Sequence, residues 1–350
     1  MYFKRLPGLL PGLVYKGIVK DSSRTMSNAQ KFQVYVTRSD MPESGIEILK
    51  KQCNLKIWDK PSPVPRTQLL SAVSGVIGIY CSLSDKIDKE VLDAAGPGLK
   101  VVATISVGYD HIDLTECKKR GIRVGYTPDV LTDATAELTL ALLLSTSRRL
   151  PEAQHEAKTG GWVSWAPTWM TGPGLAGATV GIVGFGRIGQ AVARRVKAFN
   201  TAKILYFNRS ERPEAKEIGA EKVSFDELIT QSDFVICCAA LVPETKEIFN
   251  KSAFVKMKRN AIFVNTSRGG TVDQDALIEA LKNNTIRAAG LDVTTPEPLP
   301  LDSPLFTLKN CVVLPHIGSA SIEARNTMSE LTANNIVAAL NGEDMPAELK

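Results

Sequence analysis

Three glycines in the stretch VGIVGFGRIGQ have the spacing of a dinucleotide-binding turn. Gly184, Gly186 and Gly189 follow an apolar, β-branched segment and precede AVARRVKAF, whose apolar residues repeat at the period of a helix. In such a strand–turn–helix the first glycine permits a tight turn, the second lets backbone N–H groups approach a pyrophosphate, and the third lets the helix pack close to the strand. The helix N-terminus then offers unpaired N–H groups and a partial positive charge to the anion. The spacing alone is weak evidence, but its context predicts a dinucleotide site rather than a chance glycine turn.

Three further polar residues follow predicted strands in the same half of the chain. Arg268 lies in NTSRGG, Glu297 in TTPEPLP and His316 in LPHIGSA. Because ligands of open α/β sheets bind outside the carboxyl ends of the strands, we expect these three side chains to gather near the dinucleotide. A nicotinamide enzyme that acts on a 2-oxo acid needs a cation for the carboxylate, a proton donor for the carbonyl oxygen, and a partner that keeps the donor protonated.

The types of these residues suit the three roles. The guanidinium of Arg268 can hold a carboxylate through two parallel hydrogen bonds; the alternative is a surface arginine in a turn. Imidazole has an ordinary pKa near neutral, so His316 is the candidate acid. His111 and His155 lie in surroundings more typical of structural histidines. A carboxylate beside imidazolium raises the pKa of the imidazole, which makes Glu297 the candidate partner, although an exposed glutamate between two prolines would give the same pattern.

The residues after the strand KILYFN indicate which dinucleotide binds. NAD-binding folds place an acidic residue about 20 positions after the glycines, where it binds the ribose 2′-hydroxyl. Here the strand ends at Asn208, and Arg209 and Ser210 follow it. Arg209 can pair with a 2′-phosphate and Arg212 can help, while Glu211 between them is a mild objection. We therefore predict that the cofactor is NADP, with NADPH preferred over NADH.

The motifs GFGRIG, NTSRGG, GLDVTTPEP and LPHIGSA resemble, in order and spacing, those of the D-2-hydroxyacid dehydrogenase family. The resemblance covers about residues 32–350. It implies that Arg268 binds the substrate and that His316, paired with Glu297, is the acid–base. It also implies that Asp292 of the GLDV motif lies by the nicotinamide, and that backbone N–H groups of residues 106–108 hold the substrate carboxylate.

The motifs and the resemblance together give the expected site residues. The expected catalytic residues are Arg268, Glu297 and His316. The expected substrate-binding residues are Ser106, Val107, Gly108, Trp165, Arg268, Asp292 and Ser319. The expected cofactor-binding residues are Gly184, Gly186, Arg187, Ile188, Gly189, Arg209, Ser210, Arg212, Thr266, Asp292 and Gly318. No cluster of histidines and cysteines has the spacing of a metal site, so no metal is expected.

Within the family, the GGWVSWAPTW loop, RVGYTPDVLTDATAEL and the ending MPAELK resemble the animal glyoxylate/hydroxypyruvate reductases. This implies NADPH-dependent reduction of glyoxylate to glycolate and of hydroxypyruvate to D-glycerate, with His316 as general acid. It also implies a homodimer in which Trp165, or else Trp169, closes the substrate pocket of the other copy; simple packing of the loop is the alternative. A dinucleotide-sensing, corepressor-like binding protein remains the alternative from another class, because such corepressors share the Arg–Glu–His set.

Strands that alternate with helices predict the α/β class, with two Rossmann-like, doubly wound parallel-sheet domains and an interdomain cleft. We expect an extension over residues 1–30, a substrate domain over 31–130 plus 316–350, and a dinucleotide-binding domain over 131–315. A long helix is predicted over 132–150, capped by Thr132 or Asp133. A last helix over 321–340 is expected to return to the substrate domain.

Charge and composition exclude several other classes. The chain of 350 residues has a formal net charge of +5, of which residues 1–25 hold +4, so no basic face for nucleic acid is expected. No apolar run is long enough to span a membrane. The cysteines lack CxxC pairs and are expected to be reduced thiols, which favours a cytoplasmic location. The basic, apolar residues 1–25 leave a mitochondrial presequence open as an alternative.

Overall fold

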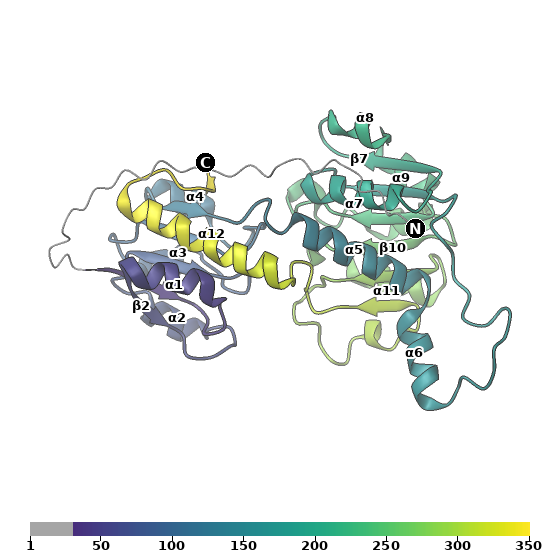
Figure 1. Cartoon of the computed structure of the whole chain (residues 1–350), viewed down its shortest axis with the longest axis horizontal. Helices are drawn as coiled ribbons and strands as arrows, with labels where there is room; N and C mark the ends of the chain where they lie inside the picture. Colours follow the sequence, from purple (N-terminus) through teal and green to yellow (C-terminus); the bar gives the residue numbers. More distant parts are fainter. Residues whose placement is uncertain (1–30) are drawn as a thin grey trace, which may run out of the picture. The chain divides into compact units, whose positions relative to one another are not determined.

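The computed structural model describes residues 31–350, so the extension predicted over residues 1–30 lies outside the described residues. The described chain forms two parallel sheets, each with helices around it, which confirms the predicted fold class (Figure 1). The first sheet has the strand order β13-β5-β4-β3-β1-β2, and every pair is parallel except β13 with β5. Its strands are β1 (Phe32–Val36), β2 (Cys53–Ile57), β3 (Gly78–Cys81), β4 (Val101–Thr104), β5 (Arg123–Gly125) and β13 (Glu348–Leu349).

The second sheet is entirely parallel and has the order β12-β11-β10-β9-β6-β7-β8. The chain starts at β6, moves outward to β8, and then returns to the other side of β6 at β9. In such sheets the crevice for a ligand lies where the strand order reverses, outside the carboxyl ends of β6 and β9. The strands are β6 (Thr179–Val183), β7 (Lys203–Phe207), β8 (Ala220–Lys222), β9 (Phe234–Cys237), β10 (Ile262–Asn265), β11 (Ala288–Leu291) and β12 (Cys311–Val313).

Helices pack against both sheets. Those that connect consecutive strands of the first sheet are α1 (Glu43–Gln52), α2 (Arg66–Ala72), α3 (Lys89–Ala95) and α4 (Leu114–Lys119). The others, in chain order, are α5 (Thr132–Ser147), α6 (Leu150–Thr159), α7 (Arg187–Lys197), α8 (Glu214–Ile218), α9 (Phe225–Gln231), α10 (Lys251–Lys256), α11 (Gln274–Lys282) and α12 (Ile322–Asn341). Single-turn helices also occur at Pro243–Thr245, Gly269–Thr271 and Pro304–Phe306.

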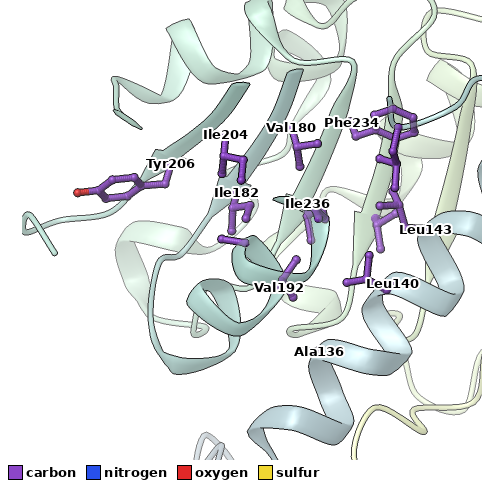
Figure 2. Packing of buried hydrophobic residues seen from close by; sticks show 14 of the residues in the cluster. Ala136, Leu140, Leu143, Val180, Ile182, Val192, Ile204, Tyr206, Phe234 and Ile236 are labelled. Atoms are coloured by element: carbon purple, nitrogen blue, oxygen red, sulfur yellow. The ribbon is translucent and has the colours of Figure 1, made fainter. Parts of the chain in front are cut away.

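The core of the second sheet holds the glycine-rich turn in place. Apolar side chains of β6, β7 and β9 face Val192 of α7 and Leu140 and Leu143 of α5, and all of these are buried (Figure 2). The opposite face is covered by α9, α10 and α11, around a cluster of phenylalanines that includes Phe249 and Phe263. Burial of each such side chain stabilises the fold by about 1.5–3 kcal/mol, so the strand before the turn is firmly anchored.

The last long helix returns to the first sheet, as predicted. Helix α12 lies beside α1, although nearly the whole chain separates them in sequence (Figure 1). Buried Met328 and Ile336 of α12 join the core with Val34 and Val101 of the first sheet. Helix α5 instead packs on α7 and the second sheet. The exact domain boundaries after residues 130 and 315 stay a prediction.

Several local predictions differ from the structure. The helix expected over 132–150 ends at Ser147, and α6 begins separately after Arg149, whose φ of 55° breaks the helical path. Neither Thr132 nor Asp133 caps α5: the cap position is Leu131, and no side chain makes a capping hydrogen bond there. The short elements α8, β8 and β13 were not expected, because two to five residues carry too little periodic pattern to predict them.

The remaining composition-based expectations concern thiols, membranes and metals. Cys81, Cys117, Cys237, Cys238 and Cys311 have free thiols, and the first three of them are buried. Among the described residues, no helix combines the length and apolarity needed to cross a bilayer. Residues 31–350 also hold no cluster of three or more histidine, cysteine or acidic side chains arranged to bind a metal ion.

Candidate functional site

The glycine-rich turn after β6 has the backbone conformation that its sequence requires. Gly184 has a φ of 91°, and a Cβ added to it would lie 2.5 Å from the backbone nitrogen of Ala239, just after β9. A Cβ on Gly189 would overlap the carbonyl oxygen of Gly184, so the absence of a side chain lets α7 approach the turn. Gly186 occupies the cap position of α7, and a Cβ there would meet no described atom within 4 Å. The turn therefore leaves open space at the N-terminus of an eleven-residue helix, which fits a pyrophosphate.

Asn208 connects this turn to the loop that is predicted to distinguish NADP from NAD. Its Oδ1 accepts a hydrogen bond from the N–H of Phe185 at 3.3 Å, and its Nδ2 donates to the carbonyl of Ser210 at 2.9 Å. The sequence showed only that Asn208 is not acidic. The structure adds that it ties the glycine turn to the loop that carries Arg209.

The side chains predicted to hold a 2′-phosphate lie on the surface beside that turn. Arg209, Ser210 and Arg212 are all exposed. The backbone N–H of Arg212 donates to the hydroxyl of Tyr206 at 3.2 Å, which fixes the loop to β7. Within residues 31–350, neither Arg209 nor Arg212 forms an ion pair with an acidic side chain, Glu211 included.

Arg268 lies in a tight turn directly after β10. The buried Asn265 donates through Nδ2 to the carbonyl of Arg268 at 3.0 Å and accepts through Oδ1 from the N–H of Ser267 at 3.0 Å. A Cβ on the next residue, Gly269, would overlap the carbonyl oxygen of Thr294. Glycine at this position therefore permits a close backbone approach that any side chain would block.

The guanidinium of Arg268 reaches the segment that was expected to hold the substrate carboxylate. Its Nε donates to Asp110 Oδ1 at 2.9 Å, and its Nη1 donates to the carbonyl of Ser267 at 2.9 Å. A Cβ added to Gly108 would overlap its Nη2. Although burial alone would raise the pKa of the Asp110 carboxyl, the charge of Arg268 lowers it below its usual value. Asp110 could not be identified from the sequence, because one acidic residue in a loop gives no signal of its partner.

A chain of polar groups lies under the same segment. Ser106 donates through its hydroxyl to the carbonyl of Gly108 at 2.7 Å, and its Oγ lies 2.8 Å from the hydroxyl of Thr104. The Thr104 hydroxyl is also 3.0 Å from Nε2 of His111. Burial lowers the pKa of His111 to about 4, so this histidine is neutral at physiological pH. Together these groups fix the conformation of residues 106–108.

His316 and Glu297 form the predicted pair. Nδ1 of His316 lies 2.7 Å from Oε2 of Glu297, and the two side chains are 24% and 31% exposed. The other carboxylate oxygen of Glu297 accepts from the N–H of Thr294 at 3.0 Å. Burial would raise the pKa of Glu297, but the hydrogen bond to His316 and the charge of the ring outweigh it and lower that pKa. Nδ1 is thus engaged by an ionised carboxylate, and Nε2 is the ring nitrogen that Glu297 does not hold.

Asp292 fixes the turn that carries His316. Its side chain is buried, and its two oxygens accept from the N–H groups of Ile317 and Gly318, each at 2.8 Å. Its carbonyl accepts from the N–H of His316 at 2.9 Å. Burial raises the pKa of Asp292 despite these hydrogen bonds. His316 itself has a φ of 56°, so the surrounding structure holds it in an uncommon conformation.

The structure brings the predicted residues together in two adjoining groups. Arg268 lies with residues 106–110, and His316 lies with Glu297 and Asp292. The groups meet where Gly269 touches Thr294, whose N–H binds Glu297. Four other predicted residues lie outside these groups. The hydroxyl of Thr266 is 2.8 Å from that of Thr139 in α5, and Arg187 forms an ion pair with Asp129. Ile188 packs at the edge of the core, and Ser319 is half-buried after Gly318.

The tryptophan loop stays apart from the core of the described chain. Trp165 is 82% exposed, and Trp162 and Trp169 are exposed as well. Exposed aromatic side chains on one loop are typical of a surface that contacts another molecule. Within the described chain, a side chain as exposed as Trp165 does not cover the residues around Arg268.

Comparison with known proteins bears on the identity of this site. The family described as D-isomer specific 2-hydroxyacid dehydrogenase, NAD binding domain, matches residues 140–318. Human glyoxylate reductase/hydroxypyruvate reductase is 55% identical over 327 residues, which are 93% of this chain and 100% of the human protein. Glyoxylate reductase of Thermococcus kodakarensis is 49% identical over 319 residues, covering 90% of this chain and 95% of that protein.

A solved structure gives a comparison of the fold. The NADPH-dependent glyoxylate/hydroxypyruvate reductase of Sinorhizobium meliloti, solved with NADP and malonate, superposes with a TM-score of 0.78 at 32% identity. The match covers 91% of this chain and 97% of that one. The similarity therefore extends over both sheets.

Proposed function

We propose, since the chain belongs to the D-isomer specific 2-hydroxyacid dehydrogenase family, that it reduces glyoxylate to glycolate and hydroxypyruvate to D-glycerate with NADPH. The observation that carries the proposal is the geometry around His316, Glu297 and Arg268. It supplies one acid with a carboxylate partner and one guanidinium against a backbone loop. The name of the human relative contains both activities, and that of the Thermococcus kodakarensis relative contains glyoxylate reduction.

The chemistry assigns each residue one task. When bound, the nicotinamide supplies the hydride that the carbonyl carbon accepts. Arg268 binds the carboxylate of the 2-oxo acid together with the backbone N–H groups of residues 106–108, and so orients the carbonyl. His316 donates a proton to the carbonyl oxygen, and Glu297 holds the ring through Nδ1 while the proton leaves Nε2. Asp292 keeps the backbone around His316 fixed.

The preference for NADPH rests on the loop after β7. Arg209 and Arg212 are exposed cations without an acidic partner among residues 31–350, and Asn208 stands where NAD-binding folds place an acid. A charge-assisted hydrogen bond contributes about 1.5–3 kcal/mol, so each arginine that binds the 2′-phosphate gives at least about tenfold preference. We expect Arg209→Ala to lower kcat/KM for NADPH about tenfold or more and to leave that for NADH unchanged. Arg194→Ala, an exposed arginine on α7, is the matched control.

The substrate assignment is tested by following NADPH oxidation across a panel of short 2-oxo acids. We expect the highest kcat/KM on glyoxylate and hydroxypyruvate, and a low value on 2-oxo acids with longer side chains. An enzyme that turns over none of the panel would contradict the proposal. That result would favour the alternative hypothesis of a corepressor-like binding protein, which the reductase relatives do not support.

A homodimer is the second part of the proposal. The exposed Trp162, Trp165 and Trp169 sit on one loop after α6, and such a surface is stabilised by burial against a second copy. In our proposal Trp165 then borders the substrate pocket of the other copy. Light scattering should give twice the mass of the chain, and Trp165→Ala should raise KM for glyoxylate. A monomer in solution would contradict this part alone.

We propose a cytoplasmic location, in keeping with the free, buried thiols of Cys81, Cys117 and Cys237. Cell fractionation of the full chain, compared with a variant that begins at Met26, tests it. Import of the full chain into mitochondria would instead assign residues 1–25 as a presequence.

A further inference from the structure

The ion pair of Arg268 with Asp110 joins parts of the chain that belong to different sheets. Arg268 follows β10 of the second sheet, whereas Asp110 lies between β4 and α4 of the first. Their residue numbers differ by 158, yet Nε and Oδ1 are 2.9 Å apart. The arginine is 19% exposed and the aspartate 41%, so the pair is partly shielded from water on the arginine side.

The hydrogen bonds that the Arg268 guanidinium makes within the protein leave some of its N–H groups for a ligand. A guanidinium carries five N–H groups in a rigid plane. The one on Nε goes to Asp110, and one on Nη1 goes to the carbonyl of Ser267. Both N–H groups of Nη2 and one of Nη1 are then left for a ligand, which is enough for a two-pronged grip on a carboxylate.

Asp110 also determines where this free side of the guanidinium lies. Since Nε is held by Asp110, the plane of the group is fixed at both ends, and Nη2 comes against Gly108. Gly108 lies in the segment whose carbonyl is held by Ser106. Asp110 belongs to the same segment, two residues further on, so a single loop sets both the backbone N–H groups and the position of the guanidinium.

We infer that Asp110 is a positioning residue for substrate binding, which holds the Arg268 guanidinium against residues 106–108 in the orientation that accepts the carboxylate of a 2-oxo acid. Without it, Arg268 keeps one anchor, at Ser267, and its plane is free to turn about that bond. This inference rests on the proposed role of Arg268 in binding the substrate carboxylate. It assigns to Asp110 no contact with the substrate.

The experiment compares Asp110→Ala with Asp110→Asn in the full chain. We expect Asp110→Ala to raise KM for glyoxylate about 10- to 100-fold, with kcat lowered less and KM for NADPH unchanged. The amide oxygen of Asp110→Asn can still accept from Nε, so this variant should stay within about threefold of the wild type. A purely structural role would instead lower stability and reduce the apparent kcat in proportion to the amount of folded enzyme, while both KM values stayed unchanged.

A double-mutant cycle tests whether Asp110 acts through Arg268. In the background of Arg268→Ala, adding Asp110→Ala should change KM less than about twofold, because the partner is already gone. The matched control is Asp113→Ala, which removes a carboxylate three residues further along that accepts from the N–H of Glu116 at 3.0 Å and caps α4. It should lower the melting temperature and leave KM for glyoxylate unchanged.

Titration of oxalate into the complex of the enzyme with NADPH separates this inference from the proposed function. The expected result is the same 10- to 100-fold weakening of oxalate binding by Asp110→Ala, read from fluorescence without turnover. An enzyme that does not reduce glyoxylate would refute the proposed function, and the oxalate titration would still decide the role of Asp110. Equal oxalate affinity of wild type and Asp110→Ala, or an undiminished effect in the Arg268→Ala background, would overturn the inference.

Discussion

Replacing Gly108 by alanine should separate substrate binding from folding. An added Cβ would overlap Nη2 of Arg268 and lie 2.6 Å from Cζ and 3.1 Å from Nε. Gly108 is not among the residues with positive φ, so alanine brings no backbone strain. All the close atoms belong to the end of one long side chain. We therefore expect the guanidinium to move and the backbone to stay.

The size of the effect follows from that displacement. Cζ has to retreat from 2.6 Å to an ordinary contact of at least 3.4 Å, a shift of about 1 Å that also pulls Nη2 away from the loop. Two charge-assisted hydrogen bonds to a carboxylate contribute about 3–6 kcal/mol together, so kcat/KM for glyoxylate should fall at least about 100-fold. The weakened ion pair with Asp110 is partly exposed and costs at most about 1 kcal/mol of stability.

Steady-state NADPH oxidation and urea unfolding measure the two effects. Gly98→Ala is the control, because a Cβ on Gly98 meets no described atom within 4 Å. We expect it to match the wild type in both assays. If Gly108→Ala keeps kcat/KM within about threefold of the wild type, Arg268 does not bind the substrate from this position.

Three further predictions concern neighbouring groups. The pKa of His111 is lowered to about 4, so the folded protein should lose about 3 kcal/mol of stability as the pH falls from 6.5 to 4. His111→Asn should remove this pH dependence of the free energy of urea unfolding. The exposed His155→Asn is the control and should leave the dependence unchanged. Asp292→Asn should cost about 1–3 kcal/mol in the same assay, since one of the N–H groups at residues 317 and 318 loses its acceptor; an unchanged midpoint would contradict this. Gly184→Ala should weaken NADPH binding in a fluorescence titration, because φ is 91° and the backbone of Ala239 blocks the new Cβ; unchanged affinity would contradict the assignment of the turn.

The elements that carry chemistry could be predicted from sequence because their signals are local. The glycine spacing after an apolar strand predicted the turn at Gly184, and the positions of Arg268 and His316 after predicted strands led us to expect both at one edge of the sheet. Parallel strands present their carboxyl ends at one edge, so residues far apart in sequence share a site by topology alone. The pairing of His316 with Glu297 needed only this rule and complementary charge.

What could not be predicted depends on tertiary contacts. Asp110 approaches Arg268 because two separate sheets are packed in one way, and no periodicity encodes that. Asn208 gains its role from the turn across from it. Leu131 takes the cap position of α5 because the chain enters the helix after the left-handed Asp129, so Thr132 and Asp133 already lie inside the first turn.

The most direct test of the central claim is the turnover of His316→Asn with glyoxylate. Asparagine tolerates the φ of 56° at this position better than alanine, so the variant keeps the backbone and loses only the acid. General acid catalysis contributes about 10²–10⁴-fold, and kcat should fall by that factor while the affinity for NADPH stays within about twofold. A variant that binds NADPH and still reduces glyoxylate at most of the wild-type rate would contradict the role of His316.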